Sequence, residues 1–327
     1  MNSRKLLVSI NRLSLRAIVG ILVIAGLGAC DVSEPAPPIV VGAYGYDGYE
    51  PLYWAETLEL YPEGSVHLVE TPFDIGLLQA FRGAAVDAQT LTLSRIHDWQ
   101  VQGVDAAIVL PIVESSGIDR IIAQPGVTSL SDLKGKRVGL ERKTVNEYVL
   151  RRALETVGLT LDDLVLVEGE NDLLFEELMA GNLDAISAYG DETTDPGPDY
   201  PVLFSSTELP GEILDILAVR RDFLVEHPDR VIDLVYGILK ASEYFHQLPD
   251  DALLPQGSVY NRTKADIRGV TLLTADQVSG LFADNAAVLR ELLTARATAE
   301  ETQIGNTITI DTEPFVEALK RLKAEQK

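Results

Sequence analysis

The sequence predicts an α/β protein in which short strands and helices alternate along most of the chain. Apolar, β-branched runs recur between segments of helical periodicity, and a glycine follows several of the helical segments where a helix would stop. The 327 residues exceed one comfortable hydrophobic core and indicate about two domains. With 46% hydrophobic and 24% charged residues, the composition is globular. We therefore expect mainly parallel sheets flanked by helices.

The first expected elements alternate strictly between strand and helix. Pro51 suits the first position of a helix, and Gly83 and Gly103 follow helical segments. Such a βαβαβαβ order favours a parallel sheet with helices on both faces. Expected strands are 39–44, 65–70, 86–91 and 106–113, and expected helices are 51–60, 74–82 and 94–102.

A second set of strands and helices follows, and the last hundred residues are expected to be mostly helical. The segments 77–88 and 173–185 both have the pattern of a helix, a glycine and then Asp-Ala. This similarity indicates either an internal duplication or the helix–glycine–strand pattern that is common to α/β units. Expected strands are 119–123, 135–140, 164–168, 184–188, 202–205 and 213–220, with a helical turn at 130–133 and helices at 146–157, 172–180, 228–246, 274–282, 285–293 and 312–323.

The first 29 residues have the pattern of a secretory signal peptide. They carry four bases and no acid, and residues 17–29 form an uncharged run that ends in small residues. This run is shorter than the roughly 20 residues that span a membrane. It ends in Leu-Gly-Ala before Cys30, which resembles a bacterial lipobox, with Gly28 a less usual choice. A buried free cysteine or ordinary signal cleavage are the alternatives.

The lipobox resemblance implies that Cys30 becomes the first mature residue and carries several acyl chains, palmitate among them. Multiple chains give stable membrane anchoring. Asp31 resembles an inner-membrane retention signal, and residues 30–38 would be a lipidated, proline-rich tether. The expected location is the periplasmic face of the inner membrane, or the cell-surface membrane in a Gram-positive source.

Charge and motifs exclude several classes of function. The 50 acidic and 27 basic residues give a net charge of −23, and removing the four bases of the signal peptide leaves −27, so nucleic-acid binding is not expected. One cysteine excludes a disulfide framework and a multi-cysteine metal site. The four histidines form no ligand-spaced pair, and G-x-S-x-G, P-loop and H-E-x-x-H motifs are absent. We expect no enzyme activity, no metal and no cofactor.

Several short motifs follow one another along the chain. They are Tyr-Glu-Pro-Leu-Tyr-Trp-Ala at 49–55, Arg-Gly at 82–83, Val-Asp-Ala at 86–88, Glu-Ser-Ser-Gly-Ile-Asp at 114–119, Ser-Leu-Ser-Asp-Leu-Lys-Gly-Lys-Arg-Val-Gly at 129–139, Gly-Asn-Leu-Asp-Ala at 181–185 and Glu-Leu-Pro-Gly-Glu-Ile-Leu-Asp at 208–215. In this order they resemble the periplasmic solute-binding proteins of ABC importers, in the nitrate, sulfonate and taurine branch that includes binders of thiamine-pyrimidine precursors. The resemblance covers roughly residues 40–245. Related pyrimidine synthases use a cysteine-rich segment that this chain lacks.

The resemblance implies the two-lobed, type II periplasmic-binding-protein fold with the ligand in the cleft between the lobes. Residues 39–116 and 215–327 would form lobe 1, and residues 117–214 would form lobe 2. The implied function is capture of a small solute and its delivery to an ABC permease and its ATPase, by a protein expected to be a monomer. A ligand-sensing regulatory lipoprotein with the same fold is the alternative.

Ligands of open parallel sheets bind beyond the carboxyl ends of the strands, and this rule selects thirteen candidate residues. Tyrosines and carboxylates among them favour a neutral or cationic, nitrogen-containing solute, whereas a sulfonate would need Arg142, Lys143 or a helix N-terminus. The candidates are Tyr46, Asp47, Tyr49, Thr71, Thr90, Thr92, Ser115, Ser116, Thr144, Asn146, Tyr189, Asp191 and Asp215.

Each candidate also has a structural alternative. Thr71, Thr144 and Asn146 are also typical helix caps. The two tyrosines at 46 and 49 would equally suit core packing, and the two serines at 115 and 116 a hinge turn. Asp191 lies in an acidic loop where it would simply be solvated, and Trp54 is expected in the core rather than in a pocket.

Overall fold

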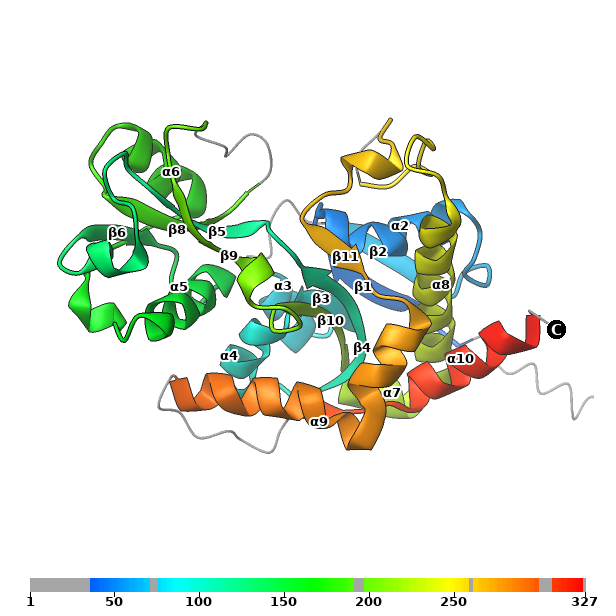
Figure 1. The fold of residues 1–327 in the computed structure, drawn as a ribbon. Coiled ribbons are helices and arrows are strands. Elements are labelled where there is room, and N and C mark those ends of the chain that lie inside the picture. The colour runs from blue at the N-terminus through cyan, green and yellow to red at the C-terminus, as the bar shows by residue number, and fades with distance from the viewer. Residues whose placement is uncertain (1–35, 71–75, 191–196, 259–260, 300–307, 326–327) are drawn as a thin grey trace, which may run out of the picture. The chain divides into compact units, whose positions relative to one another are not determined.

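The computed structural model describes residues 36–70, 76–190, 197–258, 261–299 and 308–325. Residues 38–327 form one compact unit built around two β-sheets (Figure 1). Cys30, Thr71 and Asp191 lie outside the described residues, as does the expected signal peptide. Within the described residues, no helix combines the length and the apolarity that crossing a bilayer requires.

The first sheet has the strand order β11-β4-β10-β3-β1-β2, with β12 paired to β4. β1 is parallel to β2 and to β3, whereas β10 is antiparallel to both β3 and β4. The start of β10 therefore lies at the same edge of the sheet as the ends of β3 and β4. The strands are β1 (Ile39–Ala43), β2 (Val66–Glu70), β3 (Ala88–Thr92), β4 (Ala106–Ser115), β10 (Leu214–Arg220), β11 (Val270–Leu272) and β12 (Ile308–Ile310).

The second sheet has the strand order β7-β6-β8-β5-β9. β6 is parallel to β7 and β8, and β5 is antiparallel to β8 and β9. Asp119 pairs with Tyr189, so the start of β5 lies beside the end of β8. The strands are β5 (Asp119–Ala123), β6 (Arg137–Leu140), β7 (Val165–Glu168), β8 (Ala185–Tyr189) and β9 (Val202–Ser205).

Helices cover both faces of the second sheet. Ile121 packs in one cluster with apolar residues of α5, and its chain neighbour Ile122 packs in another with residues of α6. Because successive side chains of a strand point to opposite faces, α5 and α6 lie on opposite faces of this sheet. α5 spans Val145–Thr156 and α6 spans Asn171–Met179.

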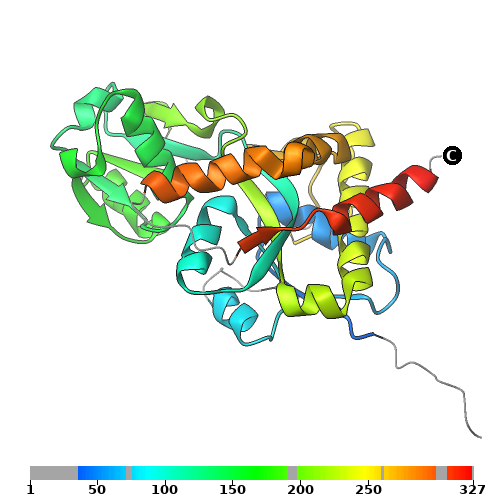
Figure 2. The same cartoon turned by 90° about the horizontal axis from the view of Figure 1, so that it is seen from below.

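The first sheet has its own core, which takes in the C-terminal helices. α8 packs against β1, β4 and α2, and α10 packs across α8, as Figure 2 shows for the red and yellow-green helices. Trp54 of α2 is buried and stacks on Phe245 of α8, which confirms its expected core position. The helices are α2 (Glu50–Thr57), α3 (Leu77–Arg82), α4 (Ile96–Val101), α7 (Arg221–Glu226), α8 (Pro228–Gln247), α9 (Ala275–Ala299) and α10 (Glu313–Glu325).

Most expected elements are present, and the differences have physical reasons. The sheets are mixed rather than uniformly parallel because β5 and β10, which follow the two crossings between sheets, enter antiparallel to their neighbours. The three-residue strands β11 and β12 are too short to give a periodic signal, and the sequence analysis missed them. The separate helices expected at 274–282 and 285–293 lie within α9, which has non-helical backbone at 283–286.

Candidate functional site

The chain crosses between the two sheets twice, and the two crossings are hydrogen-bonded together. The Ser115 N–H donates to the carbonyl of Ile213 (2.9 Å), and the Gly117 N–H donates to Ser206 Oγ (2.7 Å). Gly117 has φ of 111° and Gly211 has φ of 75°, which other residues rarely adopt. Each crossing therefore contains a glycine whose backbone conformation allows the chain to turn there.

The crossings join the carboxyl-end edges of both sheets. Ser115 ends β4, and Asp119 begins β5 beside the end of β8. Four residues of extended chain span at most about 14 Å, so the two edges lie close to one another. α5 of the second sheet also contacts the short 3₁₀ helix η2 (Leu93–Arg95) that follows β3 of the first.

A buried carboxyl lies at the first crossing. Asp119 is 2% exposed and accepts a hydrogen bond from Ser115 Oγ, which lies 3.3 Å from Ser206 Oγ. Burial raises the pKa of Asp119 to about 6, although the hydrogen bond from Ser115 acts to lower it. No cation contributes to this shift among the described residues.

A second buried carboxyl lies at the return crossing. Asp215, at the start of β10, is 8% exposed and accepts hydrogen bonds from the side chains of Thr92 and Tyr49. Burial, together with the charge of Asp119, raises the pKa of Asp215 to about 7, although the hydrogen bonds from Thr92 and Tyr49 act to lower it. The structure thus brings the predicted residues Thr92, Tyr49, Ser115 and Asp215 together.

Three tyrosines surround these carboxyls. The ring centroids of Tyr46 and Tyr49 are 5.0 Å apart, and those of Tyr44 and Tyr49 are 5.2 Å apart, both edge to face. The Tyr44 and Tyr49 hydroxyls are 3.3 Å apart. Burial, and next the charges of Asp215 and Asp119, raise the pKa of Tyr46. Tyr46 therefore lies close to both carboxyls.

Several buried polar atoms at these edges have no hydrogen-bond partner among the described residues. Asn146, on the first turn of α5, is fully buried, and neither Oδ1 nor Nδ2 of its side chain is bonded. Thr90 Oγ1 and Ser94 Oγ are also buried and have no hydrogen-bond partner among the described residues. Because an unpaired buried polar group costs free energy, these atoms are candidate contacts for a ligand.

The remaining predicted residues have other environments. Thr144 caps α5 by accepting the Asn146 N–H (3.2 Å), as the capping alternative expects. Asp47 forms a two-pronged ion pair with Arg262. Ser116 is exposed, and Tyr189 is 44% exposed at the end of β8.

Sequence reasoning did not select Asp119, Ser206 or Tyr44 as site residues. Asp119 begins a strand directly after a crossing, as Asp215 does, so the rule that selected Asp215 would also have found it. Ser206 lies between Ser205 and Thr207 in a capping turn, and nothing in its local sequence marks its contact with Gly117.

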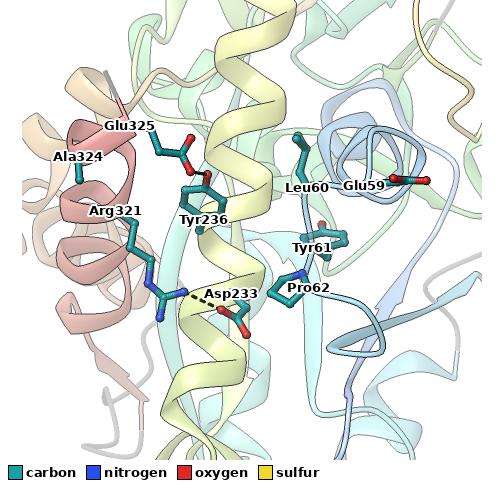
Figure 3. A pocket seen from close by; sticks show the side chains of 9 residues that line it. All are labelled: Glu59, Leu60, Tyr61, Pro62, Asp233, Tyr236, Arg321, Ala324 and Glu325. Carbon is teal, nitrogen blue, oxygen red and sulfur yellow. Dashed lines mark hydrogen bonds and ion pairs between the residues drawn. The ribbon is translucent and has the colours of Figure 1, made fainter. Parts of the chain in front are cut away.

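A surface pocket of about 490 Å³ lies elsewhere, between α8, α10 and residues 59–62 (Figure 3). Three of its charged side chains, Asp233, Arg321 and Glu325, are paired with one another or with their neighbours. Arg321 donates to Asp233 (2.6 Å), and Lys240 and Tyr236 donate to Glu325 (2.5 Å each). The described residues contain no group of three histidine, cysteine or acidic side chains that could hold a metal ion.

The arrangement is that of periplasmic binding proteins. The periplasmic sulfonate-binding protein SsuA from Methylobacillus flagellatus superposes with a TM-score of 0.66 at 17% identity, covering 89% of this chain and 96% of that one. The alkanesulfonate-binding protein SsuA from Xanthomonas axonopodis pv. citri, bound to MOPS, gives 0.59 at 16% identity, covering 84% and 100%. These likenesses confirm the predicted fold class.

Sequence comparison identifies the branch of this fold that the chain resembles. Residues 100–252 match the family described as NMT1/THI5 like. A binding protein of Brucella abortus is 23% identical over 150 residues, which is 41% of this chain and 44% of the relative, so the match spans less than half of either. The resemblance to solute-binding proteins of the sulfonate and pyrimidine-precursor type is confirmed.

The same fold also occurs in an enzyme. The desulfurization enzyme DSZB superposes with a TM-score of 0.59 at 13% identity, covering 88% of this chain and all of that one. Fold alone therefore does not separate binding from catalysis, and the function must be argued from the site.

Proposed function

We propose that this protein is the extracytoplasmic solute-binding protein of an ABC importer. It captures a small solute between the carboxyl-end edges of its two sheets and delivers it to a membrane permease served by a cytoplasmic ATPase. The protein performs no chemistry on the solute. The binding proteins among its relatives and structural neighbours support this function.

The observation that carries the proposal is the set of buried, unpartnered polar atoms beside two glycine-containing crossings. Asn146 lies on α5, which packs on the second sheet, and Thr90 lies on β3 of the first sheet. Both are fully buried, and their side chains have no hydrogen-bond partner among the described residues. A solute that satisfies both stabilises the arrangement in which the edges meet. Such differential contact shifts the population toward the closed state, with the crossings as hinges.

We further propose that the two sheets act as two lobes, residues 39–116 with 215–327 and residues 117–214, tethered to the membrane through lipid at Cys30. The presence of two separate sheets, each with its own core, supports this division. Replacing Cys30 by alanine is expected to release the protein from the membrane fraction. Unchanged membrane attachment of Cys30→Ala would show that the lipobox interpretation is wrong.

The solute is proposed to be small and either nitrogen-containing, neutral or cationic, or of the sulfonate type. Two of the structural neighbours are sulfonate-binding proteins, and MOPS, bound to one of them, carries a sulfonate. The carboxyls of Asp119 and Asp215 favour the nitrogen-containing class instead.

A screen of amines, pyrimidines, sulfonates and dicarboxylates by thermal shift tests the function, because a bound solute raises stability by mass action. Small-angle scattering should show compaction with any solute that binds. Binding without compaction would contradict closure of two lobes, and the absence of any binding would contradict the function itself.

Asn146→Ala gives a sharper test of the site. If the amide exists to contact solute, its removal leaves the stability of the free protein unchanged or higher, because an unpartnered buried group is lost, while solute affinity falls at least about tenfold. Asn182→Ala, which removes an exposed amide bonded to Glu177, is the matched control. Lower stability with unchanged affinity in Asn146→Ala would assign the amide a structural role.

A ligand-sensing regulatory lipoprotein is the alternative function, since it would use the same site. Deletion of the gene distinguishes the two, because a transport protein is needed for uptake of its solute and a sensor is not. Genes for a permease and an ATPase beside this one would favour transport.

A further inference from the structure

We propose that the solute carries an organic ammonium group, bound with its N–H donors toward Asp119 and Asp215 and its charge beside the rings of Tyr46 and Tyr49. This inference rests on the proposed function and deepens it by choosing one class of solute. It sets the protein apart from the sulfonate-binding proteins that share its fold.

The charge of the two carboxyls is not balanced by the described part of the chain. Asp119 is near enough to Asp215 for its charge to raise the pKa of Asp215, and the hydrogen-bond partners of the two carboxyls are hydroxyl groups of Ser115, Thr92 and Tyr49. Glu50 is buried and bonded to Ser258, but several other buried or half-buried carboxylates of the chain have an arginine beside them. Examples are Asp47 with Arg262, Asp87 with Arg220, Glu147 with Arg151, Glu212 with Arg152 and Asp233 with Arg321.

The aromatic residues are of the kind that stabilise an organic cation. Tyr49 stands edge to face with Tyr44 and with Tyr46, and each of these rings has an electron-rich face. A cation over such a face is stabilised by the ring quadrupole. The charges of both carboxyls raise the pKa of Tyr46, so the Tyr46 ring and the two carboxyls lie around the same position in the structure.

An independent observation points to a ligand at this place. Thr90 and Thr92 lie two residues apart on β3, so their side chains share a face of the sheet. Thr92 bonds to Asp215, whereas the fully buried hydroxyl of Thr90 has no partner among the described residues. Thr92 pairs with Asp215 and Thr90 with Leu217, so the Thr90 hydroxyl lies on the same face of the sheet as the Asp215 carboxyl, and one ammonium-bearing solute would satisfy both groups.

An anionic head group fits this space poorly. A sulfonate placed between Asp119 and Asp215 meets two acidic groups, and it would bind only with both of them protonated. An ammonium group has the opposite effect: it is positively charged at neutral pH and therefore stabilises the ionised form of both carboxyls.

The experiment compares matched solutes by isothermal titration and thermal shift. A set of alkyl, aromatic and diamine ammonium compounds is paired with sulfonates and alcohols that carry the same hydrocarbon. We expect at least one ammonium compound to bind and its alcohol and sulfonate counterparts not to bind. Asp215→Asn and Asp119→Asn should each weaken ammonium binding at least about tenfold, because each removes one of the two charges.

Asp105→Asn is the matched control, since Asp105 is an exposed acid paired with Arg221 just before β4, at the opposite end of that strand from Ser115. It should bind ammonium compounds as the native protein does. Asparagine is close in shape to aspartate and keeps an acceptor for Thr92 and Tyr49, and if one variant does not fold, the other decides.

The outcomes separate this inference from the proposed function. Binding of a sulfonate in preference to its ammonium counterpart overturns the inference and leaves a solute-binding protein. Ammonium binding that survives both Asp119→Asn and Asp215→Asn also overturns it. If no solute of any class binds, both the inference and the proposed function are overturned.

Discussion

Acidic side chains have opposite surroundings in two regions of this molecule. Along α8 and α10, Asp233 lies between Arg321 and Arg230, and Glu325 accepts from Lys240. At the crossings between the sheets, Asp119 and Asp215 are bonded to hydroxyl groups, and no cation contributes to the pKa shift of either among the described residues.

The pKa values follow this difference. Bonding to Lys240 and then to Tyr236 lowers the pKa of Glu325, whereas burial raises the pKa of Asp119 to about 6 and that of Asp215 to about 7. The α8–α10 acids are satisfied within the fold and need no ligand. The acids at the crossings remain costly to ionise until a positive charge arrives, which is a property of a binding site rather than of a scaffold.

The largest expected effect is a pH dependence that comes from the crossings. Because the folded pKa values of Asp119 and Asp215 are raised, the folded state binds protons more tightly than the unfolded chain. The free energy of unfolding of the native protein, minus that of the Asp119→Asn, Asp215→Asn double variant, should therefore fall by on the order of 5 kcal/mol as pH rises from about 4 to about 7. Urea unfolding at several pH values measures it.

Parallel pH profiles for the native protein and the double variant would contradict the raised pKa values. They would also remove the contrast between the two regions.

A smaller loss of stability is expected when a carboxylate that is paired with arginines along α8 and α10 is removed. Asp233→Asn leaves Arg321 and Arg230 facing each other with no acid between them, and should destabilise the protein by about 2 kcal/mol. Urea unfolding measures the stability, and titration with the solute found in the screen should show unchanged affinity. Reduced affinity would mean that the α8–α10 pocket contributes to binding, against the comparison made above.

Glu212→Gln is expected to cost about 1 kcal/mol, with a pH dependence of opposite sign. Glu212 accepts two hydrogen bonds from Arg152, at 2.8 and 3.0 Å, and one from Tyr148, and these lower its pKa. Its contribution is therefore present above the unfolded pKa and is lost as pH falls through the folded pKa. The native-minus-variant difference in unfolding free energy should shrink in acid, and a difference that grows in acid would contradict this pairing.

The smallest effect is expected at an exposed acid. Asp105 is 65% exposed where it pairs with Arg221, so Asp105→Asn should change the unfolding free energy by less than about 0.5 kcal/mol. Chemical unfolding measures it. A loss as large as that of Asp233→Asn would show that exposure does not govern the value of these pairs.

Much of the fold was predictable because its elements carry local signals. The strand Asp119–Ala123 and the turn Leu130–Leu133 have the bounds expected from their sequences, whereas α5 differs from expectation by one residue at each end and α8 by one residue at its C-terminal end. Local signals did not extend to β11 and β12, which are strands only because they pair with β4. The antiparallel direction of β10 also depends on its neighbours, since it follows a crossing from the other sheet.

The site was predictable in part for the same reason. The rule that ligands lie beyond carboxyl ends of strands selected Thr92 and Ser115, and the position at the return crossing selected Asp215; the structure brings these three residues together. It also selected Asp47, whose partner Arg262 is more than 200 residues away in the chain. A contact of that separation leaves no trace in the local sequence.

The sequence alone determined the alternation of elements, the family resemblance, the acidic charge and the position of the single cysteine, because composition and short-range patterns encode these. Only the tertiary structure decided which acids are paired and which are not. Asp47 and Asp215 are alike in the sequence, yet one lies against an arginine and the other among hydroxyl groups at a crossing. The physical reason is that burial and long-range pairing set the cost of a charge, and both arise only when distant segments fold together.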